Sequence, residues 1–202
     1  MGDLYKRELL RTIYREYARD SAFNHLREHH RPKRVVPGHG SLNPKVIFVG
    51  EAPGRAEATT GKPFMGAAGA ILDDVLNHVG LKREMVFITN IVKYRPTVGT
   101  LSVRNRTPST AEIVASIPYL RREIDVFGPA IPVIALGSSA LKALPDHLFR
   151  TITEASGHGW YDADRSYGAV FHPAVAVYDP NSIHVIFRDI AALRDLWEIG
   201  NM

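Results

Sequence analysis

The sequence has no cysteine among its 202 residues. Disulfide bonds, thiolate zinc sites, iron–sulfur clusters and a cysteine nucleophile are therefore excluded from this chain. It also lacks an apolar run near the roughly 20 residues that a membrane-spanning helix needs. Charged residues interrupt the N-terminal segment, unlike the apolar core of a signal peptide. We expect a cytoplasmic protein with no membrane segment, no metal and no other cofactor.

Charge of either sign is not in large excess. Lys and Arg number 25 and Asp and Glu 21, so the net charge is +4. Hydrophobic residues make up 45% of the chain, which is ordinary for a folded protein and excludes a disordered tail. The length suits one domain over residues 1–202. The small positive surplus permits a nucleic-acid partner but does not establish one.

Four short apolar runs have the pattern of buried strands. Each lacks the alternation of a half-buried strand, and this is typical of parallel sheets that are covered on both faces. The runs are residues 45–50, 86–90, 131–137 and 169–171.

Helical patterns alternate with these runs. The N-terminal helix belongs to residues 1–20, and proline and glycine mark residues 29–44 as an irregular connection. Pro118 is expected to kink or interrupt the third helix. The alternation predicts an α/β fold, a three-layer α/β/α sandwich around a mainly parallel four-stranded sheet. Apolar residues with a period near 3.6 predict helices over residues 3–19, 67–79, 110–127 and 182–199.

In such a sheet, ligands bind where loops leave the carboxyl ends of the strands. The first strand leads into residues 50–55 and 61–69, two loops rich in small residues. They do not form a nucleotide-binding loop, because six residues separate Gly54 from Gly61 and Pro63 stands where a hydroxyl residue would hold magnesium. The pattern therefore argues against an NTPase.

Four side chains near the strand ends are candidates for chemistry. Glu51 is suited to act as a general base or to orient water, and Phe64 to stack on a planar ligand. Asn90 offers an amide donor and acceptor, and His172 can donate a hydrogen bond to a developing anion. Each residue alone also has an ordinary structural explanation: a turn glutamate, a hydrophobic plug, a helix cap and a structural histidine.

Taken together, five sequence blocks resemble those of the uracil-DNA glycosylase superfamily, most closely its family 4. They follow one another in the family's order, and the resemblance covers most of residues 20–199. The blocks are Gly50-Glu51-Ala52-Pro53-Gly54, Gly61-Lys62-Pro63-Phe64-Met65-Gly66-Ala67-Ala68-Gly69, Thr89-Asn90-Ile91-Val92-Lys93-Tyr94-Arg95-Pro96, Asn105-Arg106-Thr107-Pro108 and His172-Pro173-Ala174.

The resemblance implies an enzyme that hydrolyses the N-glycosidic bond of uracil in DNA and leaves an abasic site. Glu51 would orient the attacking water, and His172 would stabilise the departing uracil anion. The residues implied in uracil binding are Gly50, Ala52, Pro53, Phe64 and Asn90. Candidate DNA contacts are Arg55, Lys62, Arg104, Asn105 and Arg106, together with Val175, Val177 and Tyr178 as a wedge in the base stack.

One departure from family 4 concerns its 4Fe–4S cluster, which four cysteines hold in the enzymes that this chain resembles. Two would fall within Ala22–Leu26, one at Tyr94 and one near Ser116, and all four are missing. We expect no cluster, and we expect packing of Phe23, Tyr94 and Tyr119 to hold that end of the domain instead.

Two other branches of the superfamily fit less well. The X-type branch traps DNA through a histidine in a K-R-R-I-H loop where this chain has Asn105, so irreversible capture is not expected. Family 5 lacks the carboxylate that Glu51 supplies. A glycosylase for hypoxanthine or xanthine, or a DNA-binding member without catalysis, remain alternatives. We expect a monomer associated with the nucleoid, whose partner is damaged DNA.

Overall fold

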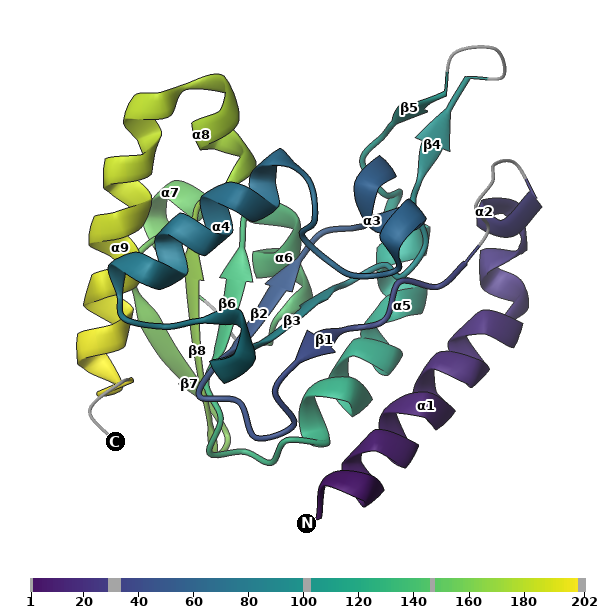
Figure 1. Ribbon diagram of the computed structural model, residues 1–202, viewed down its shortest axis with the longest axis horizontal. Helices are drawn as coiled ribbons and strands as arrows, with labels where there is room; N and C mark the ends of the chain where they lie inside the picture. Colours follow the sequence, from purple (N-terminus) through teal and green to yellow (C-terminus); the bar gives the residue numbers. More distant parts are fainter. Residues whose placement is uncertain (1, 29–33, 100–102, 146–147, 200–202) are drawn as a thin grey trace.

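A six-stranded sheet lies at the centre of the structure, with helices on both faces (Figure 1). The computed structural model describes residues 2–28, 34–99, 103–145 and 148–199. Four central strands are parallel to one another and correspond to the four apolar runs of the sequence. In spatial order these strands are β3 (Phe87–Asn90), β2 (Ile47–Gly50), β6 (Val133–Leu136) and β8 (Arg165–Val170).

Short antiparallel strands extend the parallel sheet at both edges. They are β1 (His39–Gly40) beside β3 and β7 (Gly159–Asp162) beside β8. The expectation of four strands is therefore right for the parallel centre and incomplete at the edges. The first edge strand lies within the predicted irregular connection, of which residues 29–33 are outside the described residues. A separate hairpin pairs β4 (Thr97–Val98) with β5 (Arg104–Asn105).

The helices form two layers because alternate residues of each central strand face opposite sides of the sheet. Ile47 and Val49 belong to one apolar cluster, whereas Val46 and Phe48 belong to the other. The first face is covered by α1 (Asp3–Arg19), α5 (Thr110–Asp125) and α6 (Ser138–Ala143). The second is covered by α4 (Ala67–His78), α8 (Ala174–Tyr178) and α9 (Ile183–Leu196).

Shorter elements complete the chain, and the predicted three-layer arrangement is confirmed (Figure 1). None of the described helices is long and apolar enough to cross a membrane. The short elements are α2 (Asn24–Glu28), α3 (Arg55–Thr60), α7 (Ile152–Ala155) and the 3-10 helices η1 (Ser21–Phe23), η2 (Arg83–Met85) and η3 (Pro180–Ser182).

Helix α5 continues through Pro118 without interruption, contrary to one of the two expected outcomes. A proline removes one hydrogen bond, to the carbonyl four residues earlier, which is that of Val114. Val114 is 59% exposed, so water can satisfy this carbonyl. At the start of the helix, the Ser109 side chain accepts from the backbone N–H of Glu112, and the Glu112 carboxylate accepts from that of Ser109. This reciprocal cap fixes where the helix begins.

An aromatic cluster joins α1 to α5 at the end of the domain near α2. The ring of Tyr17 stacks on Phe23 with a centroid separation of 4.1 Å. Tyr94 and Tyr119 lie 5.7 and 5.1 Å from the same ring. The Tyr17 hydroxyl is 3.0 Å from the Ser116 hydroxyl and accepts from the backbone N–H of Lys93. Tyr17, absent from the sequence-based proposal, is therefore the central ring of this cluster.

Candidate active site

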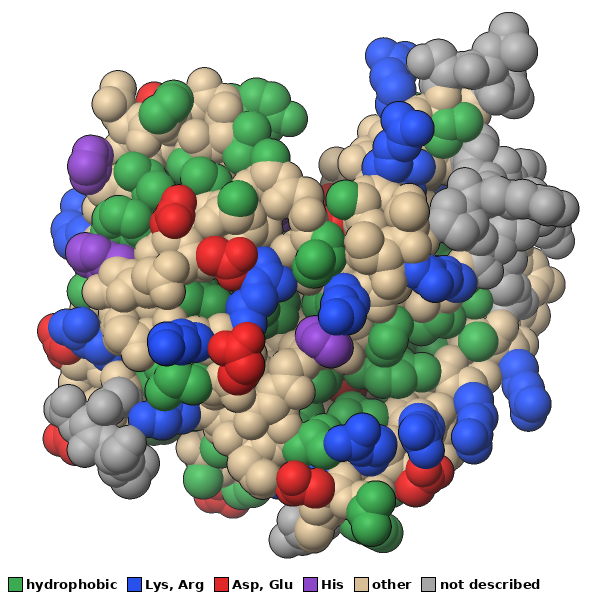
Figure 2. All heavy atoms as spheres, in the orientation of Figure 1, with side chains coloured by type: hydrophobic (Ala, Val, Ile, Leu, Met, Phe, Trp, Pro, Cys, Tyr) green, Lys and Arg blue, Asp and Glu red, His purple; other side chains and the backbone are tan. Residues whose placement is uncertain are grey.

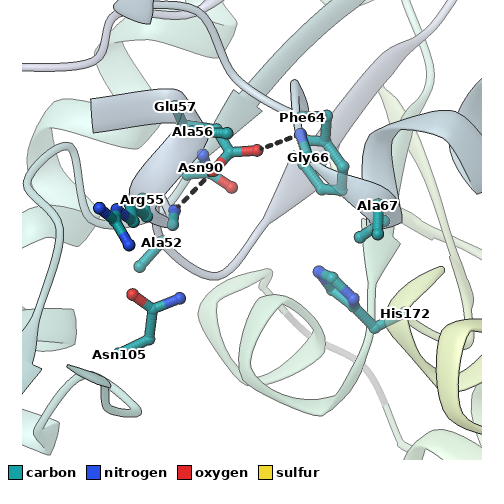
Figure 3. Close-up of a pocket in the computed structure, with 12 residues that line it drawn as sticks. Ala52, Arg55, Ala56, Glu57, Phe64, Gly66, Ala67, Asn90, Asn105 and His172 are labelled. Atoms are coloured by element: carbon teal, nitrogen blue, oxygen red, sulfur yellow. Dashed lines mark hydrogen bonds between the residues drawn. The ribbon is translucent and has the colours of Figure 1, made fainter. Parts of the chain in front are cut away.

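A pocket of about 300 Å³ opens at the carboxyl ends of the central strands. Small residues from segments 52–56 and 66–68 form part of its wall. Figure 3 shows the larger side chains around it, contributed by five separate segments of the chain. These side chains are Arg55, Glu57, Phe64, Asn90, Asn105 and His172.

Phe64 is held in a conformation that bulky residues rarely adopt. Its φ is 53°, in the left-handed region. A Cβ added at Gly69 would lie 2.0 Å from the Phe64 carbonyl oxygen, and one at Gly50 would lie 2.7 Å from the ring. These two glycines therefore permit the close approach of the Phe64 loop to the sheet and to α4.

Arg83 holds the loop that carries Phe64 in place from outside the pocket. Its guanidinium donates to the backbone carbonyls of Phe64 at 2.6 Å and Gly69 at 3.2 Å, and to the Asp73 carboxylate at 2.5 Å. The Phe64 ring is consequently fixed at 5.6 Å from the His172 ring, with 28° between their planes.

Glu57 joins the two glycine-rich loops. Its Oε2 accepts from the backbone N–H of Gly54 at 2.9 Å, and its Oε1 accepts from those of Met65 and Gly66 at 2.8 and 2.9 Å. Figure 3 shows two of these bonds, to Gly54 and to Gly66. The carboxylate therefore holds together the loops that carry Ala52 and Phe64.

Asn90 ends strand β3 and is only 3% exposed. Its backbone carbonyl accepts from the ammonium of Lys93 at 2.5 Å, and this lysine is completely buried. Lys93 also forms an ion pair of 2.5 Å with buried Glu123 and donates to Thr89 at 2.6 Å. Tyr14 donates to the other oxygen of Glu123. This network joins α1, α5 and β3 and fixes the backbone from which the Asn90 side chain extends.

His172 follows β8 and points toward Phe64 (Figure 3). Burial lowers the pKa of its imidazole to about 4. Its Nδ1 accepts from the backbone N–H of Ala174 at 3.1 Å. An Nδ1 that accepts carries no proton, so the neutral ring has its proton on Nε2. The ring is therefore a neutral hydrogen-bond donor at ordinary pH.

The other residues of the first block lie around the pocket at different depths. Ala52 lines it, Gly50 lies beneath Phe64 and Asn90, and Pro53 is buried in the connecting loop. Glu51 does not line this pocket. Its carboxylate accepts from the hydroxyl of Ser139 in α6 at 2.5 Å.

Among the residues that the structure describes, some of the proposed DNA-contacting cations form an ion pair and others do not. Arg55 lines the pocket mouth, and Arg104 is exposed on β5. Arg106 instead forms two hydrogen bonds, of 2.8 and 2.6 Å, with the Glu112 carboxylate. Burial alone would raise the pKa of Glu112, but hydrogen bonds from Arg106, Ser109 and His25 lower it to about 2. Lys62 lies near His39, where burial and then Lys62 lower the histidine's pKa.

The predicted wedge segment forms the short helix α8 on one side of the pocket. Val175, Val177 and Tyr178 are 36%, 42% and 89% exposed. Figure 2 shows a hollow between the part of the surface that carries α8 and the part that carries β4 and β5. Apolar side chains are prominent on the first part and Lys or Arg on the second.

Three supporting residues, Glu57, Arg83 and Lys93, were missed as functional candidates by the sequence analysis. Glu57 stands three residues after Gly54, a spacing typical of a carboxylate that caps the start of a helix. Lys93 lies inside a recognised block. Nothing local marks Arg83, because its partners are carbonyls brought near by the fold. Among the described residues, no group of three His, Asp or Glu side chains is arranged to hold a metal ion.

The fold and the pocket define an α/β protein with a small ligand site at the carboxyl edge of a parallel sheet. The family model described as the Uracil DNA glycosylase superfamily matches residues 37–198. The chain is similar to the Type-4 uracil-DNA glycosylase of Sulfurisphaera tokodaii, with 37% identity over 170 residues, 80% of this chain and 74% of that protein. The Type-4 uracil-DNA glycosylase of Thermotoga maritima is 35% identical, over 85% of each chain.

The solved structures agree on the fold. The crystal structure of SMUG2 from Pedobacter heparinus has a TM-score of 0.57 at 16% identity and covers 76% of each chain. With the family match extending over most of its length, the chain belongs to the uracil-DNA glycosylase superfamily.

The residues at the positions implied for an iron–sulfur cluster do not fit that group. No thiol is present in the chain; Tyr94 stands at one of the implied positions, and Ser116 lies near another. The Tyr94 ring lies 6.4 Å from Phe23, and the Ser116 hydroxyl is bonded to Tyr17 and to the Glu112 carbonyl. Aromatic side chains fill the region instead.

Proposed function

We propose that this protein hydrolyses the N-glycosidic bond of uracil in DNA and leaves an abasic site, without lyase activity. Family membership and a pocket with Phe64, Asn90 and His172 at its wall support the proposal. A volume of about 300 Å³ is at the small end of ligand pockets and suits a single base. A base in duplex DNA reaches such a pocket only after it is flipped out of the stack.

Recognition of the base rests on one ring and one amide. The flipped uracil stacks on Phe64, which the Arg83 bonds hold in place. Asn90 pairs with its N3–H donor and O4 acceptor, whereas cytosine presents the reversed pattern at these atoms. Because Lys93 fixes the Asn90 backbone, the amide is held in position before the base enters.

The placement of His172, buried at the pocket with its Nδ1 accepting from the Ala174 N–H, is the observation that carries the proposal. Bond cleavage leaves a cationic sugar and a uracil anion. A neutral imidazole with its proton on Nε2 donates a hydrogen bond to the O2 of this anion without first having to be charged. One such preorganised donor in a site shielded from water is worth roughly 3–4 kcal/mol of the barrier.

Two residues are candidates to orient the attacking water. Glu51 has a carboxylate suited to the task and to stabilising the cationic sugar, but its side chain is bonded to Ser139 outside the pocket lining. Asn105 lines the pocket directly, but its amide oxygen already accepts from Arg95, so its NH₂ group can hold the water only by donating to it. Comparison of Glu51→Gln with Asn105→Ala in single-turnover reactions separates these two assignments.

The surface around the pocket is suited to bent DNA. Val175, Val177 and Tyr178 on α8 are positioned to fill the gap that a flipped nucleotide leaves. Arg55 and Arg104 on the opposite side are free to contact phosphates, and such contacts make DNA binding weaken as salt rises. Arg106 forms two hydrogen bonds with Glu112, so its main role is to hold the loop around Asn105.

The defining experiment offers the purified protein a panel of oligonucleotides, each with one uracil, hypoxanthine, xanthine or thymine, as single strands and duplexes. Alkali then cleaves any abasic site. We expect strand cleavage with uracil and none with thymine. Release of hypoxanthine or xanthine in place of uracil would contradict the uracil assignment. Tight binding with no base release would replace the proposal with a non-catalytic DNA-binding role.

The rate of base release is expected to stay constant between about pH 5.5 and 8. The reason is that His172, with a pKa near 4, remains neutral throughout this range. An ordinary histidine would lose half of its neutral form near pH 6.5. Single-turnover rates across this range provide the measurement. An inflection near pH 6.5 that disappears in His172→Gln would show that the imidazole titrates normally and would contradict the prediction.

The lowered pKa of His172 also predicts how the free energy of unfolding changes with pH. Because the folded state disfavours protonated His172, the unfolded state binds more protons between about pH 6.5 and 4. The contribution of His172 to stability is therefore present above pH 6.5 and declines as the pH falls through this interval. Urea unfolding of the wild type and His172→Gln at pH 7.5 and 5 checks the sign.

A further inference from the structure

The amide of Asn105 is held in one orientation at the pocket mouth. The Nε–H of Arg95 donates to Asn105 Oδ1 at 2.6 Å. A guanidinium has donors only, so the amide atom bonded to Arg95 is the oxygen, and the NH₂ group is left to donate to another acceptor. Figure 3 shows the amide nitrogen on the pocket side. A Cβ built on Gly54 in the facing loop would lie 3.4 Å from Nδ2. Asn105 therefore presents hydrogen-bond donors to the pocket.

Two guanidinium groups, those of Arg55 and Arg95, lie beside this amide. Figure 3 places the Arg55 side chain next to Asn105. Partial burial and the nearby charge of Arg55 lower the pKa of Arg95, with Glu57 opposing them. The carboxylate of Glu57 already accepts three backbone N–H groups. In the part of the chain that the structure describes, neither Arg55 nor Arg95 forms an ion pair.

Other arginines near the site differ in this respect. Arg83 is bonded to Asp73 and to backbone carbonyls, and Arg106 is paired with Glu112. Each of these cations has a structural partner that compensates its charge. Arg55 lines the pocket, and Arg95 lies behind the pocket-lining Asn105, where the charge of Arg55 acts on it. An anion bound between the two cations relieves their repulsion.

We propose that Arg55, Arg95 and the Asn105 amide nitrogen form a binding site for one backbone phosphate of the strand that carries the flipped nucleotide. The site offers only donors and positive charge, which matches a phosphodiester and disfavours a base edge with its own donors. Its place at the mouth of the base pocket puts that phosphate next to the sugar whose glycosidic bond is broken. Arg95 has two functions: it binds the phosphate and orients Asn105.

The proposal rests on the proposed function only in taking DNA as the ligand. It requires no base release, so it is tested with DNA that contains a tetrahydrofuran abasic-site analogue and no uracil. Single methylphosphonates, which are neutral, replace each of the four phosphates around the analogue in turn. Fluorescence anisotropy gives the dissociation constant of every combination of protein variant and oligonucleotide.

For the wild type, we expect one methylphosphonate position to weaken binding about tenfold, and a smaller effect at the others. Arg55→Gln and Arg95→Gln should each weaken binding to unmodified DNA by about tenfold and lower the slope of log affinity against log salt by about 1. For the two variants, the methylphosphonate at this sensitive position should cause no further loss of affinity, because the contact between arginine and phosphate is already lost.

Arg7→Gln is the matched control. It removes the same charge from an exposed residue of α1, far from the pocket, and should reproduce the wild-type pattern. Arg55 is exposed, and within the described ranges its side chain forms no ion pair, so Arg55→Gln tests the site even if Arg95→Gln disturbs folding. Thermal melting of each variant checks this.

Variants that remain as sensitive as the wild type at every phosphate would overturn the proposal. If the protein nevertheless releases uracil, the phosphate site is wrong and the proposed function still stands. If one methylphosphonate and the two arginine variants prove non-additive but no uracil is released, the phosphate site stands and the uracil assignment is wrong.

Discussion

His172→Ala is expected to lower the rate of uracil release about 10²–10³-fold while DNA affinity changes little. In the proposed mechanism, the hydrogen bond from the imidazole Nε2–H to the base oxygen is strongest when that oxygen carries the negative charge of the leaving group. Removing the donor therefore raises the barrier more than it weakens the bound substrate. The measurement is a single-turnover rate with a uracil oligonucleotide, accompanied by a dissociation constant for the tetrahydrofuran analogue.

Two companion variants show whether the loss comes from the donor itself. His172→Gln retains an N–H donor and should recover part of the rate. Phe64→Leu keeps an apolar side chain beside His172 but removes the stacking ring, and should mainly weaken substrate binding. Equal rates for the wild type and His172→Ala would show that leaving-group stabilisation does not depend on this residue.

The residues that meet at the pocket could be predicted because each stands in a block that follows a strand. Asn90 ends the second apolar run, Phe64 and His172 follow the first and the fourth, and parallel strands bring their carboxyl ends to one edge. The sequence could not show that Glu51 is bonded to Ser139 rather than lining the pocket. That outcome depends on how α6 packs beside β2, a contact between segments 88 residues apart.

The two edge strands of the sheet could not be predicted from the sequence, for a different reason. Strand β1 has two residues, and β7 has exposed or half-buried positions, so neither forms an apolar run. Their pairing comes from neighbouring strands that are already in place. Pro118 is the opposite case. A proline is a strong helix-breaking residue, but α5 continues through it because the carbonyl of Val114, which loses its hydrogen bond, belongs to an exposed residue that water can reach.

The buried charges around Asn90 could not be predicted from residue type alone. Lys93 and Glu123 are 30 residues apart and both fully buried, although lysine and glutamate are usually exposed. The fold compensates this burial with an ion pair and with bonds to Thr89 and Tyr14. A charged network directly behind Asn90 makes the position of this residue rigid, which suits the base-recognition role proposed for its amide.

Phe23→Ala is expected to lower the free energy of unfolding by about 3–5 kcal/mol and the melting temperature by roughly 10 °C. Phe23 is fully buried and stacks on Tyr17 where the resemblance places a metal cluster. Truncation opens a cavity beside Tyr17, Tyr94 and Tyr119. Urea unfolding and thermal melting measure the change.

Tyr119→Phe is the matched control for this cluster. It keeps the ring and removes only the hydroxyl that donates to Asp20, so its cost should be near 1 kcal/mol. The distance between the cluster and the pocket supplies a second criterion. Because Phe23 does not line the pocket, Phe23→Ala should release uracil at nearly the wild-type rate at temperatures well below its melting point. An unchanged melting temperature would mean that aromatic packing does not hold this end of the domain together.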